Sequence, residues 1–365
     1  MYNVLLEDFC ETHELGAVVE SYLFPKGMTH QTFFVMTATG KYVIKALNPD
    51  IVLDPKKRAK LIAGEFLAEV ANGAGIKSIS ANRINGQFIT EHKGQSYMVF
   101  PFCEGTFLPG TEVTHDYCFN VGELLAKLHL IDFKAAAKGQ MKIPKYIYGR
   151  KIKQAIDWQS YAVKISKKKK PPKWLPELEA NVPDWYDLFA TVWPAFLRFK
   201  PKNQLISHGG LSNPNILWHE EQPHLIDWET AGYIDPTFDC FYTATRFAIE
   251  NFGDGKRVIN PEKVNSFLTG YMKHCQIDPE RIETIFNVIV YRRLEHLHDA
   301  LKTYTGKHEL EVRRKARRRI LFSMSILKAL KAFQTQLPTI KTHIINAQPE
   351  VPTSKNWLTA LFRRR

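Results

Sequence analysis

Runs of β-branched and aromatic residues dominate the first hundred residues of the chain. Two such runs within 32–46 flank the turn Ala38-Thr39-Gly40-Lys41, which predicts a β-hairpin. Residues 55–72 carry apolar side chains at helical spacing and end near two glycines, so a helix is predicted after the hairpin. Further short strands are indicated at 87–91 and 97–102. The chain therefore begins with a small β-rich unit.

From residue 103 onward the apolar residues recur mainly at helical spacing. The stretch 205–227 differs, because its short apolar runs bracket a glycine-rich turn and a polar turn and end in carboxylates. The second unit is therefore mainly helical, with one strand-rich stretch. Its predicted helices lie at 117–129, 148–158, 178–198 and within 259–334.

This pattern predicts an α+β fold built from two lobes, since 365 residues exceed what one hydrophobic core usually holds. The N-terminal lobe is expected to span 1–102, and the C-terminal lobe 103–335. Residues 336–365 contain three prolines and are predicted to form an extended tail.

No part of the chain predicts a membrane span or an export signal. A run of about 18 uncharged apolar residues is missing, and the first residues lack a basic segment followed by an apolar one. The five cysteines are widely spaced and form no metal-binding pattern, which favours reduced thiols. We therefore expect a cytoplasmic protein.

The chain carries a large excess of positive charge. Lys and Arg number 50 against 37 for Asp and Glu, a net charge of +13 that favours anionic partners. Two basic clusters, 167–173 and 313–319, fit solvated faces, with docking of an anion or a partner as the alternative. The apolar patch and three arginines at 357–365 offer little burial on a membrane, and no motif of a dedicated nucleic-acid binder occurs.

Two motifs begin within the strand-rich stretch. The first, at 208–217, reads HGGLSNPNIL, and the second, at 225–239, reads LIDWETAGYIDPTFD. With VIK at 43–45 and VGELLAKLH at 121–129, they resemble in order and spacing the aminoglycoside phosphotransferase and choline kinase family. The resemblance implies a bilobal protein-kinase-like fold and phosphate transfer from a nucleotide to a small-molecule hydroxyl.

The same resemblance implies residues that bind metal and nucleotide. Asn215 and Asp227 match the family's metal ligands, and both offer the oxygen donors that Mg²⁺ prefers. Their spacing fits a hairpin that brings both side chains to one edge. Lys45 matches the lysine that contacts the phosphates of ATP or GTP. Glu65 is the predicted ion-pair partner of Lys45, with Glu69 as second choice.

Two further segments are expected to contact the nucleotide. Residues 25–30 lie between the first two strands, so Gly27 and Thr29 are predicted to cover the phosphates with backbone N–H groups. Residues 98–102 would form the hinge between the lobes, where Phe100 and Phe102 are predicted to lie near the adenine.

Gly210 stands where the family has the catalytic aspartate of its HGD motif. Glycine cannot accept or orient the proton of the acceptor hydroxyl, a contribution typically of about 10² to 10⁴ in rate. His208, Ser212 and Asp235 are nearby alternatives, although none places a carboxylate at the vacated position. Three explanations stay open: a pseudokinase, an enzyme that recruits another residue, and a replacement in an ordinary kinase.

The acceptor is expected to be neutral or anionic. Residues 141–200, the predicted lining of the acceptor cleft, are strongly basic and therefore disfavour polycationic aminoglycosides. Aromatic residues in this segment fit a hydrophobic core better than a stacking surface: Trp158, Tyr161, Trp174, Trp185, Tyr186 and Trp193. The sequence thus predicts an ATP- and Mg²⁺-dependent phosphotransferase of reduced activity, with a nucleotide-binding pseudokinase as the alternative.

Overall fold

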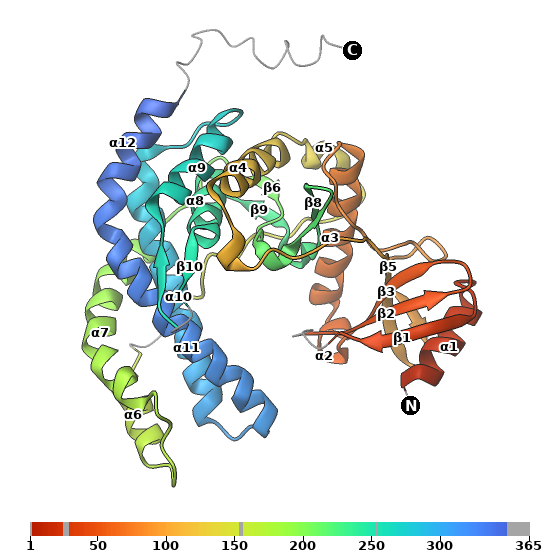
Figure 1. Cartoon of the computed structure of the whole chain (residues 1–365), viewed down its shortest axis with the longest axis horizontal. Helices are drawn as coiled ribbons and strands as arrows, with labels where there is room; N and C mark the ends of the chain where they lie inside the picture. Colours follow the sequence, from red (N-terminus) through yellow and green to blue (C-terminus); the bar gives the residue numbers. More distant parts are fainter. Residues whose placement is uncertain (1, 25–28, 153–155, 253–254, 349–365) are drawn as a thin grey trace.

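The computed structural model describes residues 2–24, 29–152, 156–252 and 255–348. A twisted sheet stands at one end of the molecule and a bundle of helices at the other (Figure 1). This arrangement confirms the predicted α+β fold with a β-rich first part and a mainly helical second part.

The β-rich part is built on an antiparallel five-stranded sheet of order β1-β2-β3-β5-β4. The hairpin predicted within 32–46 is the β2–β3 pair, in which Phe34 faces Val43. The helix predicted at 55–72 is α3, capped by the Asp54 side chain. The elements are α1 (Tyr2–Thr12), β1 (Val18–Leu23), β2 (Gln31–Thr37), β3 (Lys41–Ala46), α2 (Pro49–Val52), α3 (Pro55–Gly73), β4 (Thr90–His92) and β5 (Gln95–Pro101).

Alternation along the central strands gives the sheet two different faces. Tyr97 and Val99 of β5 pack with α1, whereas Met98 and Phe100 belong to the large core that includes α3 and the helical part. Ile44 of β3 lies on the α1 side. Its neighbour Lys45 therefore projects from the opposite face, towards the second lobe.

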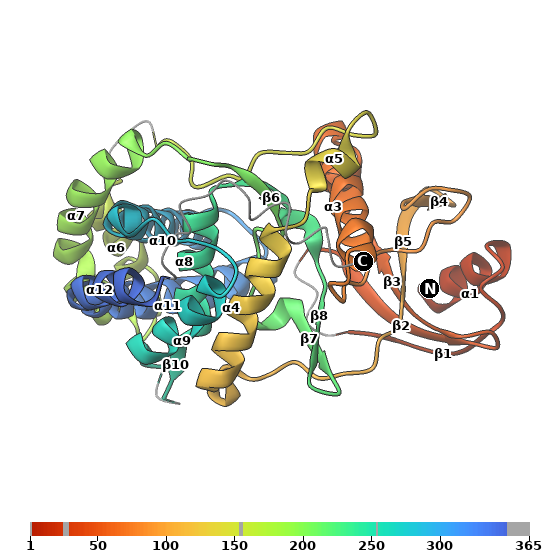
Figure 2. The same ribbon diagram turned by 90° about the horizontal axis from the view of Figure 1, so that it is seen from above.

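The helical part carries its short strands close to the first lobe. Figure 2 shows the β7–β8 hairpin between the five-stranded sheet and the helices. The elements are α4 (His115–His129), α5 (Phe133–Ala137), α6 (Trp158–Ser166), α7 (Leu175–Arg198), β6 (Leu205–Ser207), β7 (Ile216–His219), β8 (Gln222–Leu225), β9 (Gly232–Ile234), α8 (Pro236–Phe247), β10 (Ile249–Asn251), β11 (Arg257–Ile259), α9 (Pro261–Met272), α10 (Ile282–Thr305), α11 (Leu310–Phe333) and α12 (Leu337–Ala347).

The expectation of an extended tail from residue 336 is wrong for its first part. Residues Leu337–Ala347 form α12, which packs against α9 and buries Leu337, Ile340 and Ile344. Pro338 lies in the first turn of this helix, where proline is tolerated because its missing N–H has no intrahelical partner to lose. The remainder of the predicted tail, from 349, lies outside the described residues.

Within the described ranges, we find no helix with both the length and the apolar character needed to span a bilayer.

Two glycines let α4 and α9 cross in close contact. A Cβ atom on Gly122 would lie 2.0 Å from the Phe267 carbonyl oxygen, and one on Gly270 would lie 2.0 Å from the Phe119 carbonyl oxygen. Both obstacles are backbone atoms, which cannot swing aside as a side chain can. The glycine of the VGELLAKLH motif is therefore required by helix packing.

Gly122→Ala is expected to lower the free energy of unfolding by about 2 kcal/mol or more, because overpacking a close backbone contact forces the helices apart. Urea unfolding measures the change. Gly73→Ala is the matched control, since a Cβ there meets nothing within 4 Å, and it should be neutral or slightly stabilising. Equal stability of both variants would contradict this account of the α4–α9 crossing.

Candidate functional site

The β7–β8 hairpin places the two predicted metal ligands at its open end. Ile216 pairs with Leu225, and the Ile226 N–H donates to the Asn215 carbonyl oxygen over 3.1 Å. Asn215 precedes β7 directly, and Asp227 follows β8 by two residues. The twelve-residue spacing thus corresponds to the hairpin that the sequence predicted. Asp227 adopts the left-handed conformation, with φ of 65°, and 42% of its side chain is exposed.

Lys45 reaches from β3 towards this open end. Its Nζ lies 3.6 Å from Oδ1 of Asp227 and 5.0 Å from the ring centre of Phe100. Burial disfavours the charged amine, but the negative charges of Asp227, Glu229 and Glu65 outweigh it and raise the pKa of Lys45. The amine therefore stays protonated.

The structure pairs Lys45 differently from the sequence prediction. Glu65 is buried, and its carboxylate accepts the Ala81 N–H over 2.7 Å. Its charge acts on Lys45, yet the carboxylate within ion-pair distance of the amine is that of Asp227. Burial raises the pKa of Glu65 to about 7, against the lowering effect of Lys45. Glu69, the second choice, binds Arg83 instead, at 2.8 Å.

His208 holds the 208–217 loop together. Its Nε2 donates to the Ile226 carbonyl oxygen over 3.0 Å, and its Nδ1 accepts the Gly210 N–H over 3.3 Å. Burial lowers the pKa of His208, which favours the neutral ring that these two bonds require. Both ring nitrogens are engaged with the backbone, so His208 positions the loop and is poorly placed to handle a proton.

Thr230 fills the place that a side chain at position 210 would take. A Cβ built on Gly210 would lie 2.2 Å from Oγ1 of Thr230. The same hydroxyl donates to the His208 carbonyl oxygen over 3.1 Å. An aspartate at position 210 would therefore require the Thr230 side chain to move.

The other two candidates for a recruited base have different surroundings. Asp235 caps α8 through the Phe238 N–H and forms an ion pair with Arg281 at 2.6 Å, so its carboxylate is committed to structure. Ser212 is largely buried and its carbonyl oxygen accepts the Asn215 N–H over 2.8 Å. Neither Asp235 nor Ser212 therefore supplies a carboxylate in place of the one missing at position 210.

A buried polar network supports the loop from behind. Nε2 of His129 lies 3.1 Å from Oδ2 of Asp239 and 3.2 Å from Oγ of Ser207, while Nδ1 lies 2.8 Å from the Tyr271 hydroxyl. Ser207 immediately precedes His208. The VGELLAKLH helix and the last carboxylate of the second motif are thus joined to the catalytic loop by direct contacts.

Three further residues of the site, His30, Lys60 and Glu229, were not singled out from the sequence. Nε2 of His30 lies 3.4 Å from Oε1 of Glu229. Although burial opposes it, the bond to His30 and the charges of Lys45 and Lys60 hold the pKa of Glu229 below its usual value. Lys60 comes from α3, where its sequence signal is indistinguishable from that of an ordinary helix-surface lysine. Glu229 belongs to the motif at 225–239, so the sequence could have identified it as a site residue.

Of the other residues predicted to contact the nucleotide, only Phe100 lies beside Lys45 among those that the structure describes. Phe100 lies under Lys45 on the face of β5 that looks towards the second lobe. Phe102 follows β5 and packs edge-on against Phe34, with ring centres 5.1 Å apart. Thr29 is exposed, and Gly27 lies outside the described residues.

The donors present suit a hard divalent cation. Nδ2 of Asn215 donates to the Gly210 carbonyl oxygen over 2.9 Å, which leaves Oδ1 available beside the exposed carboxylate of Asp227. No cluster of three or more His, Cys, Asp and Glu side chains able to hold a metal occurs in the part of the chain that the structure describes. A cation here would therefore take its other ligands from water and phosphate oxygens, as Mg²⁺ commonly does.

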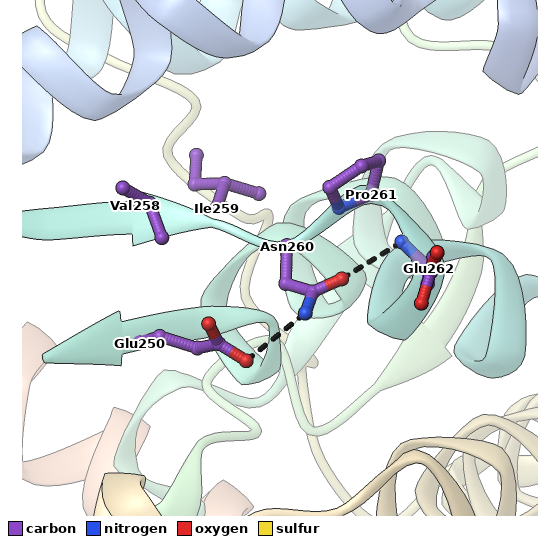
Figure 3. Close-up of a pocket in the computed structure, with 6 residues that line it drawn as sticks. All are labelled: Glu250, Val258, Ile259, Asn260, Pro261 and Glu262. Atoms are coloured by element: carbon purple, nitrogen blue, oxygen red, sulfur yellow. Dashed lines mark hydrogen bonds between the residues drawn. The ribbon is translucent and has the colours of Figure 1, made fainter.

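A separate pocket lies at the β10–β11 hairpin (Figure 3). The Asn260 side chain accepts the Glu262 N–H and donates to Glu250, and Glu250 also pairs with Lys263 at 2.8 Å. These polar groups cap α9 and satisfy one another. The pocket therefore has a structural explanation and adds nothing to the candidate site.

Several solved structures share this fold. Spectinomycin phosphotransferase APH(9)-Ia, in complex with ADP and spectinomycin, is 14% identical with a TM-score of 0.61 over 89% of this chain and 97% of that chain. Amicoumacin kinase hAmiN, in complex with AMP-PNP and Ca²⁺, is 12% identical with a TM-score of 0.55 over 84% and 88%. Choline kinase from Cryptosporidium parvum is 13% identical with a TM-score of 0.52 over 94% and 100%.

No curated protein matches the sequence significantly. A family model, described as the phosphotransferase enzyme family, matches residues 23–258. The match covers β2 to β10, including Lys45, the 208–217 loop and the β7–β8 hairpin. It therefore takes in both lobes and more than half of the chain. This protein belongs to the phosphotransferase enzyme family.

Proposed function

We propose that the protein binds a nucleotide, ATP or GTP, with Mg²⁺ and transfers its terminal phosphate slowly to a hydroxyl of a neutral or anionic small molecule. The observation that carries the proposal is the convergence of Lys45, Asp227 and Asn215 at the open end of the β7–β8 hairpin. Phosphoryl transfer depends mainly on positioning and on neutralising phosphate charge, and these residues serve both.

Each residue has a distinct task in this proposal. Lys45 would contact the phosphates, while Asp227 and Asn215 would hold Mg²⁺, which neutralises phosphate charge when bound. Glu229 and His30 would fix the far side of the site. The acceptor hydroxyl would lie near Gly210, where it meets no carboxylate and must lose its proton to water or to phosphate.

Three buried tryptophans argue against an acceptor cation that binds by stacking on them. Trp158, Trp174 and Trp185 are buried in the core that α6, α7 and α10 share. These helices lie at the end of the molecule away from the sheet (Figure 2). These three tryptophans therefore stabilise the helical lobe and present no exposed ring to a cation.

A nucleotide-binding pseudokinase is the second candidate, and the position of the Thr230 hydroxyl favours it. A loop whose space at 210 is already filled is adapted to the absence of the aspartate. In a pseudokinase, Lys45, Asn215 and Asp227 would bind the nucleotide and its metal. The nucleotide-bound protein would then regulate a partner or act as its scaffold.

Both candidate functions require nucleotide binding, and thermal-shift titration of the full chain with ATP and GTP tests it. We expect stabilisation by at least one nucleotide, larger with Mg²⁺ than with EDTA. Consumption of ATP, measured with a panel of neutral and anionic alcohols, then separates the enzyme from the pseudokinase. The absence of any nucleotide-dependent shift would overturn both.

A further inference from the structure

Arginines from two helices gather around one buried tyrosine. Tyr242 lies on α8, and its ring centre is 5.3 Å from the guanidinium carbon of Arg246 and 5.6 Å from that of Arg292. Arg293, the next residue on α10, stands 5.1 Å from the ring of Phe322 on α11. Arg246, Arg292 and Arg293 are called the arginine cluster below.

The charge of this cluster is not balanced by carboxylates. In the described ranges, no Asp or Glu oxygen comes within 4.0 Å of a nitrogen of Arg246, Arg292 or Arg293. The nearest acidic residue on the same helix, Glu295, is taken by Arg150. Burial and the charges of its arginine neighbours, only partly opposed by Tyr242, lower the pKa of Arg293 to about 10. Arg292 donates to the Ile147 carbonyl oxygen and bonds to the Tyr242 side chain, but within the described ranges no carboxylate forms an ion pair with the cluster.

Polar atoms within the cluster also lack partners. The Nε atom of Arg292 and the hydroxyl of Tyr146 are both buried without a hydrogen bond in the described structure. The guanidinium of Arg292 lies 5.0 Å from the ring centre of Tyr146. Unpaired buried donors are costly, and such groups in native proteins usually have a function.

The cluster borders the catalytic loop. Ring atoms of Tyr146 lie 3.0 and 3.1 Å from the position of a Cβ on Gly209, the residue before Gly210. From the first lobe, Lys60 interacts through its charge with both Arg292 and Glu229. Through the ring of Tyr146, Arg292 therefore borders the loop that carries Gly210, near the place where an acceptor hydroxyl would react.

We propose that the arginine cluster binds an oxyanion, a phosphate or a carboxylate, carried by the acceptor molecule. The proposal rests on the proposed function and names the substrate class for it. Planar guanidinium groups recognise oxyanions with paired hydrogen bonds, and a bound anion would offset the mutual repulsion of the cluster. The hydroxyl to be phosphorylated and the anionic group would then belong to one molecule.

The test measures binding of inorganic phosphate, and of succinate as a carboxylate probe, to the full chain by calorimetry at constant ionic strength. Arg246→Gln and Arg293→Gln are each expected to weaken binding of the preferred probe by about tenfold or more, the usual effect of losing a charge-assisted hydrogen bond. Arg317→Gln is the matched control, since it removes the same charge from an exposed position of α11 and should leave binding unchanged.

A Lys45→Met variant locates the bound anion. Phosphate binding that survives in Lys45→Met and is lost in the cluster variants supports the proposal. Binding lost in Lys45→Met places the anion in the nucleotide site and overturns it, as does no binding of either probe or equal binding by all arginine variants. Circular dichroism confirms folding of each variant. Nucleotide titration is a separate readout, so its failure would overturn the proposed function without deciding the anion site.

Discussion

Combining Gly210→Asp with Thr230→Ala is expected to raise ATP turnover by about 10² to 10⁴, whereas Gly210→Asp alone should raise it far less. The full increase is the typical contribution of a general base. The single substitution meets Oγ1 of Thr230 at 2.2 Å from its Cβ. The new carboxylate can enter only if the threonine rotates and gives up its bond to the His208 carbonyl oxygen.

The stability of the variants provides a second readout. Losing the Thr230 bond costs about 1 kcal/mol, so Gly210→Asp should unfold more easily than the parent chain. Thr230→Ala removes the obstacle in advance, and the two substitutions should therefore be coupled in a double-mutant cycle. ATP hydrolysis with water as acceptor makes the rate measurable without knowing the natural substrate.

The outcome separates an ordinary kinase that carries a replacement at Gly210 from a loop adapted to glycine and from a pseudokinase. Activity restored by Gly210→Asp alone, with unchanged stability, would identify an ordinary kinase site that carries a replacement. Activity restored only with Thr230→Ala would identify a loop adapted to glycine around intact phosphate and metal positions. Nucleotide binding without turnover in every variant would favour the pseudokinase.

The fold and the loop were predictable because their signals are local. The alternation of 32–46, the helical spacing of 55–72 and the two motifs at 208–217 and 225–239 each lie in one continuous segment. Strand pairing then fixes which residues become neighbours: the spacing of twelve from Asn215 to Asp227 leaves room for one tight hairpin. Fold class and family membership are accordingly confirmed by the structure and the family match.

Features that depend on contacts between distant segments were missed. The arginine cluster joins α8 with α10, more than forty residues later, and in each helix an arginine is an ordinary residue. The partner of Lys45 depends on a rotamer choice between Glu65 and Asp227 that spacing does not determine. Proline content predicted a tail at 336–365, but it did not reveal the apolar face that binds α12 to α9.

Asp227→Asn is expected to weaken Mg²⁺-dependent nucleotide binding by at least about 100-fold. Loss of a group that merely supports a metal ligand typically costs about 10- to 100-fold in metal affinity, and a direct ligand should cost more. The substitution keeps the shape of the side chain and removes only its charge. Calorimetric titration with ATP, in Mg²⁺ and in EDTA, measures the effect.

The EDTA arm isolates the role of the metal from that of Lys45. Asp227 lies 3.6 Å from the Lys45 amine, so without metal the neutral asparagine frees this amine for phosphate, and affinity should hold or rise. Glu221→Gln is the control, because it makes the same charge change at the opposite end of the hairpin. It should leave nucleotide affinity unchanged both in Mg²⁺ and in EDTA. A parallel loss in Mg²⁺ and EDTA would mean that Asp227 organises the loop without binding the cation. A loss confined to Mg²⁺ assigns the metal to this carboxylate.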